Sequence, residues 1–405
     1  MKISKPLLNL LCFLLALPIV ILSGCEVKPA EVSEGLESEN SAGGFMEIPL
    51  ESNKLLDLST NKKVQLDFTE YADENQFRFT FSPIGIEGRI EELTVVLPNG
   101  CSFIIDEHNI VMLREQGETE VAIEYSLRDI QSDKKEIEFN IYCGDELLDN
   151  YGHAYPIRLY FDDISLQEDQ AVVCNKTSVP VKSIFRCLYE NNKVTALIKY
   201  SGVYEISIVD SNSFEDVGGH FSEVAVNSLK TTGMLEEYGS VFQPDMFMTQ
   251  GEFLDLLLKS LDFNENDLPD EAKLAFQSIL TSDQEDISAE SESIFNDFGI
   301  AAMFLDLVEL DGFKKDSDAA IRRIDCINLI GLQISKKELY ISQASTLPQY
   351  SDYDIYSDEQ QGSINLLTEL GILSENNLEI NGHSDITRAE AVQLIYDFIV
   401  WRCKN

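Results

Sequence analysis

The sequence is poor in the residues that most often build catalytic and metal centres. Only four histidines occur among 405 residues, and no two cysteines stand in a C-x-x-C pair. Metal-ligand spacing is therefore absent. A hydrolase would have to work with carboxylates alone, and acidic clusters such as Glu285 with Asp286 and Asp352 with Asp354 are more simply interpreted as solvated loops. We predict no enzyme, no catalytic residue, no metal and no cofactor.

Positive charge is also scarce. Thirty lysines and arginines face 71 aspartates and glutamates, which gives a formal net charge of −41. Long-range attraction would not draw such a chain to nucleic acid or to an anionic membrane surface. We therefore expect no nucleic acid among its partners, and we interpret the acidity as a means of keeping an extracytoplasmic protein in solution.

Long apolar runs are missing except at the N-terminus. Lys2 and Lys5 precede an apolar run, residues 6–21, that has the length of a signal peptide. No other stretch approaches the roughly 20 apolar residues of a spanning helix. The run ends in Leu-Ser-Gly-Cys at Cys25, which resembles a bacterial lipobox. The resemblance implies removal of residues 1–24 and a lipid on Cys25 that anchors the protein to the membrane; the alternative is an ordinary signal peptide with a chance cysteine.

Residues 25–44 are rich in Glu, Ser and Gly and predict a flexible linker. Beyond it, the even number of cysteines permits disulfides outside the cytoplasm, although buried free thiols fit equally well. Cys174 and Cys187 are the first pair to test. The six cysteines concerned are Cys101, Cys143, Cys174, Cys187, Cys326 and Cys403.

Residues 45–210 show strand after strand. Polar and apolar residues alternate in "KKVQLDF", "QFRFTF", "IEELTVVL", "KEIEFNIYC" and "VTALIKY", with Asn, Asp, Gly and Pro between them. We predict an antiparallel, immunoglobulin-like β-sandwich, either one domain or two subdomains in tandem. No nucleophile elbow or phosphate loop occurs. The strand pattern resembles the β segments of secreted clostridial-type wall proteins, and this resemblance implies a spacer or a module that binds a protein partner.

Residues 211–405 change to a helical period and contain a repeat. A shift of 138 positions places Gly233 on Gly371, Thr249 on Thr387 and Glu252 on Glu390, and a shift of 73 places Glu252 on Asp325. We predict three units, residues 211–262, 263–340 and 341–405, of which the second has diverged most.

The repeated letters suggest helix starts. Thr387 with Glu390, and Thr249 with Glu252, match the S/T-x-x-E capping box. Arg388 lies in the first turn, where the helix dipole favours an anion over a cation. Its guanidinium could hold a carboxylate through two parallel hydrogen bonds, but the residues alone are equally consistent with a solvated arginine.

The succession F-x-D-V-x-x-H, F-x-P-D and T-R-A-E resembles the S-layer homology domain. The first unit has Phe214, Asp216, Val217, His220, Phe242, Pro244 and Asp245, and the third has Tyr350, Asp352, Gly371 and the complete motif at Thr387–Glu390. The resemblance implies an all-α, pseudo-trimeric three-repeat bundle whose grooves bind pyruvylated secondary cell-wall polysaccharide. The glycan-binding residues that it implies are Arg388, Arg323, Gln250, Asp216 and Asp352.

The three units depart unequally from this pattern. Gln250 stands where the first unit should have its arginine, and the second unit keeps Arg323 but has Arg322 in place of the threonine. At most two grooves therefore keep a cation. Two functions remain: a wall-binding lipoprotein, or a degenerate repeat scaffold whose β module binds a protein partner.

Overall fold

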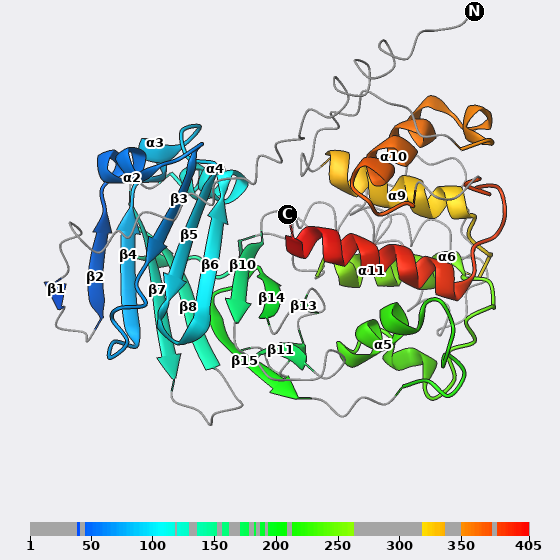
Figure 1. Ribbon diagram of the computed structural model, residues 1–405, viewed down its shortest axis with the longest axis horizontal. Helices are drawn as coiled ribbons and strands as arrows, with labels where there is room; N and C mark the ends of the chain where they lie inside the picture. The colour runs from blue at the N-terminus through cyan, green and yellow to red at the C-terminus, as the bar shows by residue number, and fades with distance from the viewer. Residues whose placement is uncertain are drawn as a thin grey trace, which may run out of the picture.

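The computed structural model describes most of residues 45–262 and the greater part of the chain after residue 317 (Figure 1). The predicted signal peptide, Cys25, most of the linker and residues 263–317 of the second unit lie outside the described residues. The described ranges are 39–40, 45–117, 120–128, 136–151, 156–161, 171–177, 182–183, 187–190, 193–208, 213–262, 318–336, 350–374 and 379–404.

Two β-sheets form the first half of the molecule (Figure 1). The larger has the order β1-β2-β4-β7-β8-β15-β11-β12, with β9 paired to β8, and the smaller has the order β13-β14-β10-β6-β5-β3. The strands of the larger sheet are β1 (Glu39–Asn40), β2 (Met46–Leu50), β4 (Gln76–Phe81), β7 (Val121–Arg128), β8 (Glu136–Cys143), β9 (Glu146–Leu147), β11 (Ala171–Asn175), β12 (Lys182–Ser183) and β15 (Gly202–Ile208). Those of the smaller are β3 (Lys63–Asp67), β5 (Glu92–Leu97), β6 (Cys101–Asp106), β10 (Ile157–Phe161), β13 (Cys187–Glu190) and β14 (Lys193–Ile198).

Aromatic side chains hold the two sheets together. Burial alternates along β4, β5 and β8, which turns one face of each strand inward. Phe103 of the smaller sheet lies between Phe79 and Phe139 of the larger, with ring centroids 5.9 Å and 5.1 Å away. The period-2 pattern of the sequence thus corresponds to a single core between the sheets.

The expected immunoglobulin-like, all-antiparallel sandwich is wrong. Both sheets are mixed, because β2 runs parallel to β4 and β3 runs parallel to β5. Three short helices lie between the strands: α2 (Ser52–Leu58), α3 (Pro83–Ile86) and α4 (Glu107–Glu115). Alternation predicts that a segment is a strand, but it says nothing about the direction of the neighbour, and helices of this length have too few turns to show a clear period.

Five helices dominate the described part of the second half: α5 (Glu223–Thr231), α6 (Gln250–Ser260), α9 (Arg323–Lys336), α10 (Asp358–Glu369) and α11 (Arg388–Lys404). Short 3₁₀ turns occur at Glu236–Tyr238 and Tyr353–Ile355, and a further one at Pro98–Gly100. Helices α5 and α10 end alike, with Gly233 and Gly371 at φ of 87° and 73°. In each case the residue after the glycine donates its N–H to a carbonyl five residues back, a Schellman motif.

The expectation of a separate all-α bundle is also wrong. The core of the helical region includes Leu197 of β14, with Leu188 of β13 packed against it, and α11 lies against both strands (Figure 1). Isolated β-bridges also join the segments that precede three of the helices. Periodicity predicted the helices, but the partner that covers an apolar face is set by tertiary packing, which no local pattern contains.

None of the described helices is long and apolar enough to cross a membrane. None of the six cysteines in this part of the chain forms a disulfide. The net pKa of Cys187 is raised to about 11, mainly by burial. A backbone hydrogen bond from Val173 lowers this pKa, and the neighbouring Cys174 raises it.

A buried lysine joins the sheets to the helices. The side chain of Lys199, just after β14, is 0 % exposed, and its Nζ donates to the backbone oxygen of Asp262, just after α6. The Asp262 carboxylate lies 4.0 Å from Nζ, and the ring of Tyr200 lies 4.8 Å away. A buried ammonium is tolerated only where such partners replace its water.

We expect Lys199→Met to lower the free energy of unfolding by about 2–3 kcal/mol, because the apolar stem is kept and the charged hydrogen bond is lost. Urea unfolding of the full chain measures it. Lys404→Met is the matched control: Lys404 also joins the two regions, through Glu190 at 2.9 Å, but that pair is about half exposed. Lys404→Met should lower the free energy of unfolding by less than about 1 kcal/mol. Equal losses in the two variants would contradict the role of Lys199 in joining the sheets to the helices.

Candidate functional site at the helix starts

Three short segments pair with one another immediately before helices α6, α9 and α11. The bridges are Phe247 with Thr387, Thr249 with Ala320, and Arg322 with Asp385. Each segment therefore contacts both of the others, and the three close into a ring that we call the helix-start ring. The first residues of the three helices are Gln250, Arg323 and Arg388, so the ring brings the motif positions of all three units together.

Capping boxes begin two of these helices. Thr249 Oγ1 accepts the N–H of Glu252 at 3.2 Å, and Glu252 Oε2 accepts the N–H of Thr249 at 2.9 Å. Thr387 and Glu390 form the same reciprocal pair at 3.3 Å and 3.0 Å. These threonines and glutamates thus satisfy backbone donors that the first turn leaves without intrahelical partners.

Arg388 is neither solvated nor free. Its Nη2 lies 2.6 Å from Glu252 Oε1, and only 14 % of its side chain is exposed. Its Nη1 donates to the backbone oxygen of Phe242 at 3.3 Å and to Gln243 Oε1 at 3.1 Å. The guanidinium lies over the ring of Tyr238, 4.9 Å from its centroid. The third unit therefore places its arginine on the loop and capping glutamate of the first.

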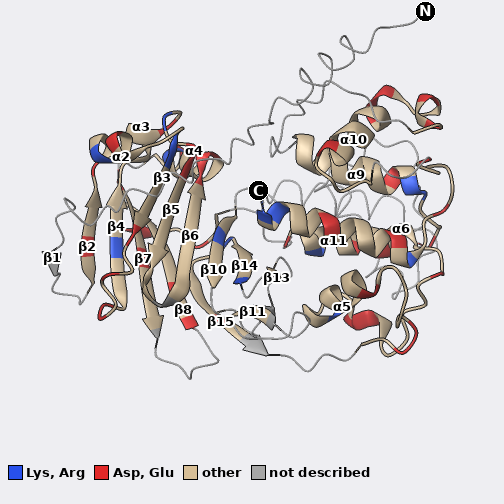
Figure 2. Cartoon of the chain, in the orientation of Figure 1, with Lys and Arg blue, Asp and Glu red and all other residues tan. Residues whose placement is uncertain are grey.

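Arg323 repeats this arrangement one unit further around the ring. Its Nη1 lies 3.0 Å from Oε1 of Glu390, the capping glutamate of the third unit. Each arginine thus forms an ion pair with the capping glutamate of a neighbouring unit. Figure 2 marks basic residues at the starts of α9 and α11 among acidic neighbours.

The remaining junction differs because Gln250 replaces the arginine. Gln250 Oε1 is buried and has no hydrogen-bond partner among the described residues. Asp325, at the position of the capping glutamate, is bound by Arg322, the residue immediately before α9, whose Nε and Nη2 lie 2.8 Å and 2.9 Å from its oxygens. The arginine in the threonine position therefore supplies the cation that Gln250 does not.

Asp216 and Asp352 occupy equivalent places and use their carboxylates internally. Asp216 accepts the N–H groups of Phe242 and Gln243 at 2.9 Å and 2.6 Å. Asp352 accepts those of Ile380 and Asn381 at 2.8 Å and 2.9 Å. The two aspartates are 352 − 216 = 136 positions apart and the loops 380 − 242 = 138, so the third unit has two extra residues between them.

These hydrogen bonds also set the charge of the carboxyls. Partial burial raises the pKa of Asp216, but backbone N–H groups outweigh it and the net pKa is lowered. Burial likewise raises the pKa of Asp352, and the Tyr356 hydroxyl, at 2.6 Å, together with the backbone donors makes the net pKa lower than usual. Both aspartates hold a loop in place.

Several neighbours of Arg388 were not anticipated from the sequence. Met246 Sδ lies 3.9 Å from Nη1, and Phe247, 56 % exposed, pairs with Thr387. Elsewhere in the first unit, Phe221, 67 % exposed, lies against His220 with ring centroids 4.5 Å apart, and His220 Nε2 lies 3.7 Å from Asp245 Oδ1. Large apolar residues in an otherwise polar loop were the signal that could have indicated this exposed surface.

Neither the protein-family models nor the curated proteins contain a match to this chain. Within the described ranges, no group of three or more His, Cys, Asp or Glu residues could hold a metal ion.

A double-mutant cycle tests the contact between the third and first units. We expect Arg388→Gln and Glu252→Gln each to destabilise the full chain and to couple by about 1–3 kcal/mol, because each variant leaves a partly buried partner unpaired. Urea unfolding measures the coupling. The same cycle on Arg322 and Asp325, a more exposed pair three residues apart at the start of α9, should give less than about 1 kcal/mol. Additive effects at Arg388 and Glu252 would refute a coupled pair.

Acid sensitivity tests the role of Asp352. Because its pKa is lowered in the folded protein, it stabilises the fold above the ordinary aspartate pKa, and this contribution is lost as pH falls through the lower, folded-state pKa. We expect the urea midpoint of Asp352→Asn to fall less than that of the wild type between about pH 5 and pH 2. Asp354→Asn, at an exposed neighbour, should follow the wild type. Identical dependence of the urea midpoint on pH in all three chains would rule out a stabilising role for the Asp352 carboxylate.

Proposed function

We propose that the protein binds an anionic cell-wall polysaccharide at the junction between its third and first units, with Arg388 as the principal contact. The observation that carries the proposal is the asymmetric use of the guanidinium. Nη2 is fixed by Glu252 at 2.6 Å, whereas Nη1 makes longer contacts of 3.1 Å and 3.3 Å beside exposed Gln243 and Met246. Glu252 orients the arginine, and a ligand carboxylate can take the place of the Nη1 acceptors.

The surroundings of Nη1 favour a sugar as the carrier of that carboxylate. Met246 and Phe247 offer exposed apolar surface close to the charge, and sugar rings present apolar C–H faces beside their hydroxyls. Sites of this kind combine apolar contact with a few placed polar groups. A pyruvate ketal on a wall sugar would supply both.

The three junctions should contribute unequally. Arg323 uses Nη1 for Glu390, and Gln250 supplies no charge. A charge-assisted hydrogen bond is worth about 1.5–3 kcal/mol against about 1 kcal/mol for a neutral one. Binding would therefore depend mainly on Arg388 and secondarily on Arg323, while Asp216 and Asp352 would shape the loops rather than contact the glycan.

We also propose a location for the protein. A lipid on Cys25 would keep the protein extracytoplasmic, at the membrane and within reach of the wall. Tethering raises the effective concentration of a weak binder, which matters because the net charge of −41 repels an anionic polymer. The β module would then be displayed between the two layers or bind a protein partner.

Co-sedimentation of the detergent-solubilised full chain with purified wall sacculi tests the proposal. We expect the wild type to sediment with intact sacculi and not with sacculi stripped of their polysaccharide. Arg388→Gln, which copies the natural residue at Gln250, should weaken binding about tenfold or more. The matched control Arg114→Gln removes an arginine of α4, in the sheet region, that pairs with Glu87 at 3.0 Å, and it should bind like the wild type.

A second function, an interaction scaffold, is favoured by one observation: both motif arginines are already paired with glutamates of neighbouring units. If wild-type protein fails to sediment with intact sacculi, the arginines are structural and the scaffold is the better proposal. Undiminished sedimentation of Arg388→Gln would instead mean that the wall is bound elsewhere on the protein.

A further inference from the structure

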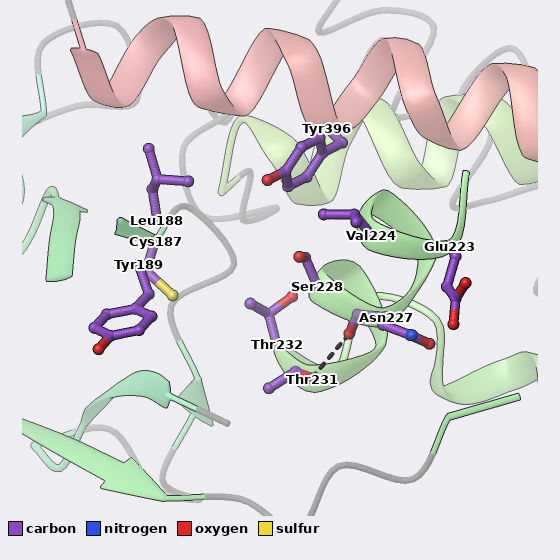
Figure 3. Close-up of a pocket in the computed structure, with 10 residues that line it drawn as sticks. All are labelled: Cys187, Leu188, Tyr189, Glu223, Val224, Asn227, Ser228, Thr231, Thr232 and Tyr396. Atoms are coloured by element: carbon purple, nitrogen blue, oxygen red, sulfur yellow. Dashed lines mark hydrogen bonds between the residues drawn. The ribbon is translucent and has the colours of Figure 1, made fainter. Parts of the chain in front are cut away.

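A cavity lies between the edge strand β13, helix α5 and helix α11 (Figure 3), and none of the residues that line it belongs to the helix-start ring. Its volume is about 330 Å³, which is at the lower end of the range for small-molecule sites. Tyr396 extends from α11 over the gap, while Ser228 and Thr232 of α5 and the sulfur of Cys187 on β13 border it (Figure 3).

The lining of this cavity is rich in hydroxyl groups. Helix α5 presents Val224, Ser228 and Thr231 on one face, at spacings of four and three residues. The Thr231 hydroxyl donates to the backbone oxygen of Asn227 at 2.8 Å (Figure 3). Hydroxyls both donate and accept hydrogen bonds, and the ring of Tyr396 adds an apolar face. This combination suits a ligand that carries many hydroxyls on a ring.

The charge of the lining restricts the ligand further. Among the described residues that line the cavity, the one charged side chain is Glu223, and its Oε2 accepts the N–H of Gly219 at 2.8 Å. None of these described lining residues is an arginine, lysine or histidine that could hold an anion. An extended peptide added to β13 would need a long groove, whereas this cavity is only about 330 Å³.

We propose that the cavity between β13, α5 and α11 is a binding site for one neutral sugar ring. The site is separate from the Arg388 junction and goes beyond the proposed function: one takes an uncharged ring and the other an anionic group. Because the sheet and the helices both line it, the site requires the two halves of the chain to stay packed together.

Saturation-transfer NMR on the solubilised full chain tests this site, with glucose, galactose, mannose, N-acetylglucosamine and N-acetylmannosamine as neutral probes and glucuronate as the anionic one. We expect signals from at least one neutral sugar, and any signal from glucuronate, whose carboxylate suits the Arg388 junction, should be the same in the wild type and in a variant with a filled cavity. Ser228→Leu, which fills the cavity, should abolish the neutral signals, and Tyr396→Phe, which keeps the ring, should weaken affinity severalfold, up to about tenfold.

Ser240→Leu, at an exposed serine outside the lining, is the matched control and should bind like the wild type. Thermal unfolding of each variant checks the fold. If Ser228→Leu fails to fold, the result for Tyr396→Phe alone decides whether the cavity binds the sugar. The absence of any neutral signal from the wild type, or unchanged signals in Ser228→Leu or in Tyr396→Phe, would overturn the proposal. Because sacculi report on the Arg388 junction and monosaccharides on this cavity, either site can fail its own test without affecting the other.

Discussion

The pairing of three short segments in the helix-start ring is the constraint on which the helical region depends. Each segment hydrogen-bonds to two different neighbours: the carbonyl of Met248 accepts from Ile321, and the carbonyl of Ile321 accepts from Ile386. Buried backbone groups must find partners, so no unit can leave without stranding donors and acceptors in the other two. The ring therefore fixes the distance and direction of all three helix starts before any side chain is considered.

Glu252 shows how this constraint couples shape to charge. One of its oxygens accepts the N–H of Thr249 and caps α6, while the other binds Arg388 of another unit. The first unit has Gln250 where the other two have an arginine, and its glutamate serves a neighbouring unit as well as its own helix. The ring is compatible with the absence of a cation at the Gln250 junction. Removal of Glu252, by contrast, would uncap α6 and also leave Arg388 without its carboxylate partner.

The sequence predicted features that lie within one segment, and it missed contacts between segments that are far apart in the chain. The capping box spans four residues, and the alternation of β4 and β8 lies within one segment, so both can be predicted from neighbouring letters. The ion pair between Arg388 and Glu252 joins residues 136 positions apart, and the parallel pairing of β2 with β4 depends on a chain that crosses to the other sheet in between. Neither leaves a trace in local pattern, and the same holds for the contacts of α11 with β13 and β14.

Those contacts explain why the two halves of the chain cannot be treated as independent modules. Leu197 of β14 lies in the core of the helices, and buried Lys199 bonds to the residue that follows α6. A helical region cut away from the sheets would expose an apolar face and leave the Asp262 carbonyl without its ammonium donor, at a cost that is large against the marginal stability of a domain. Whatever the helix-start ring binds, the sheets are therefore part of the body that holds it.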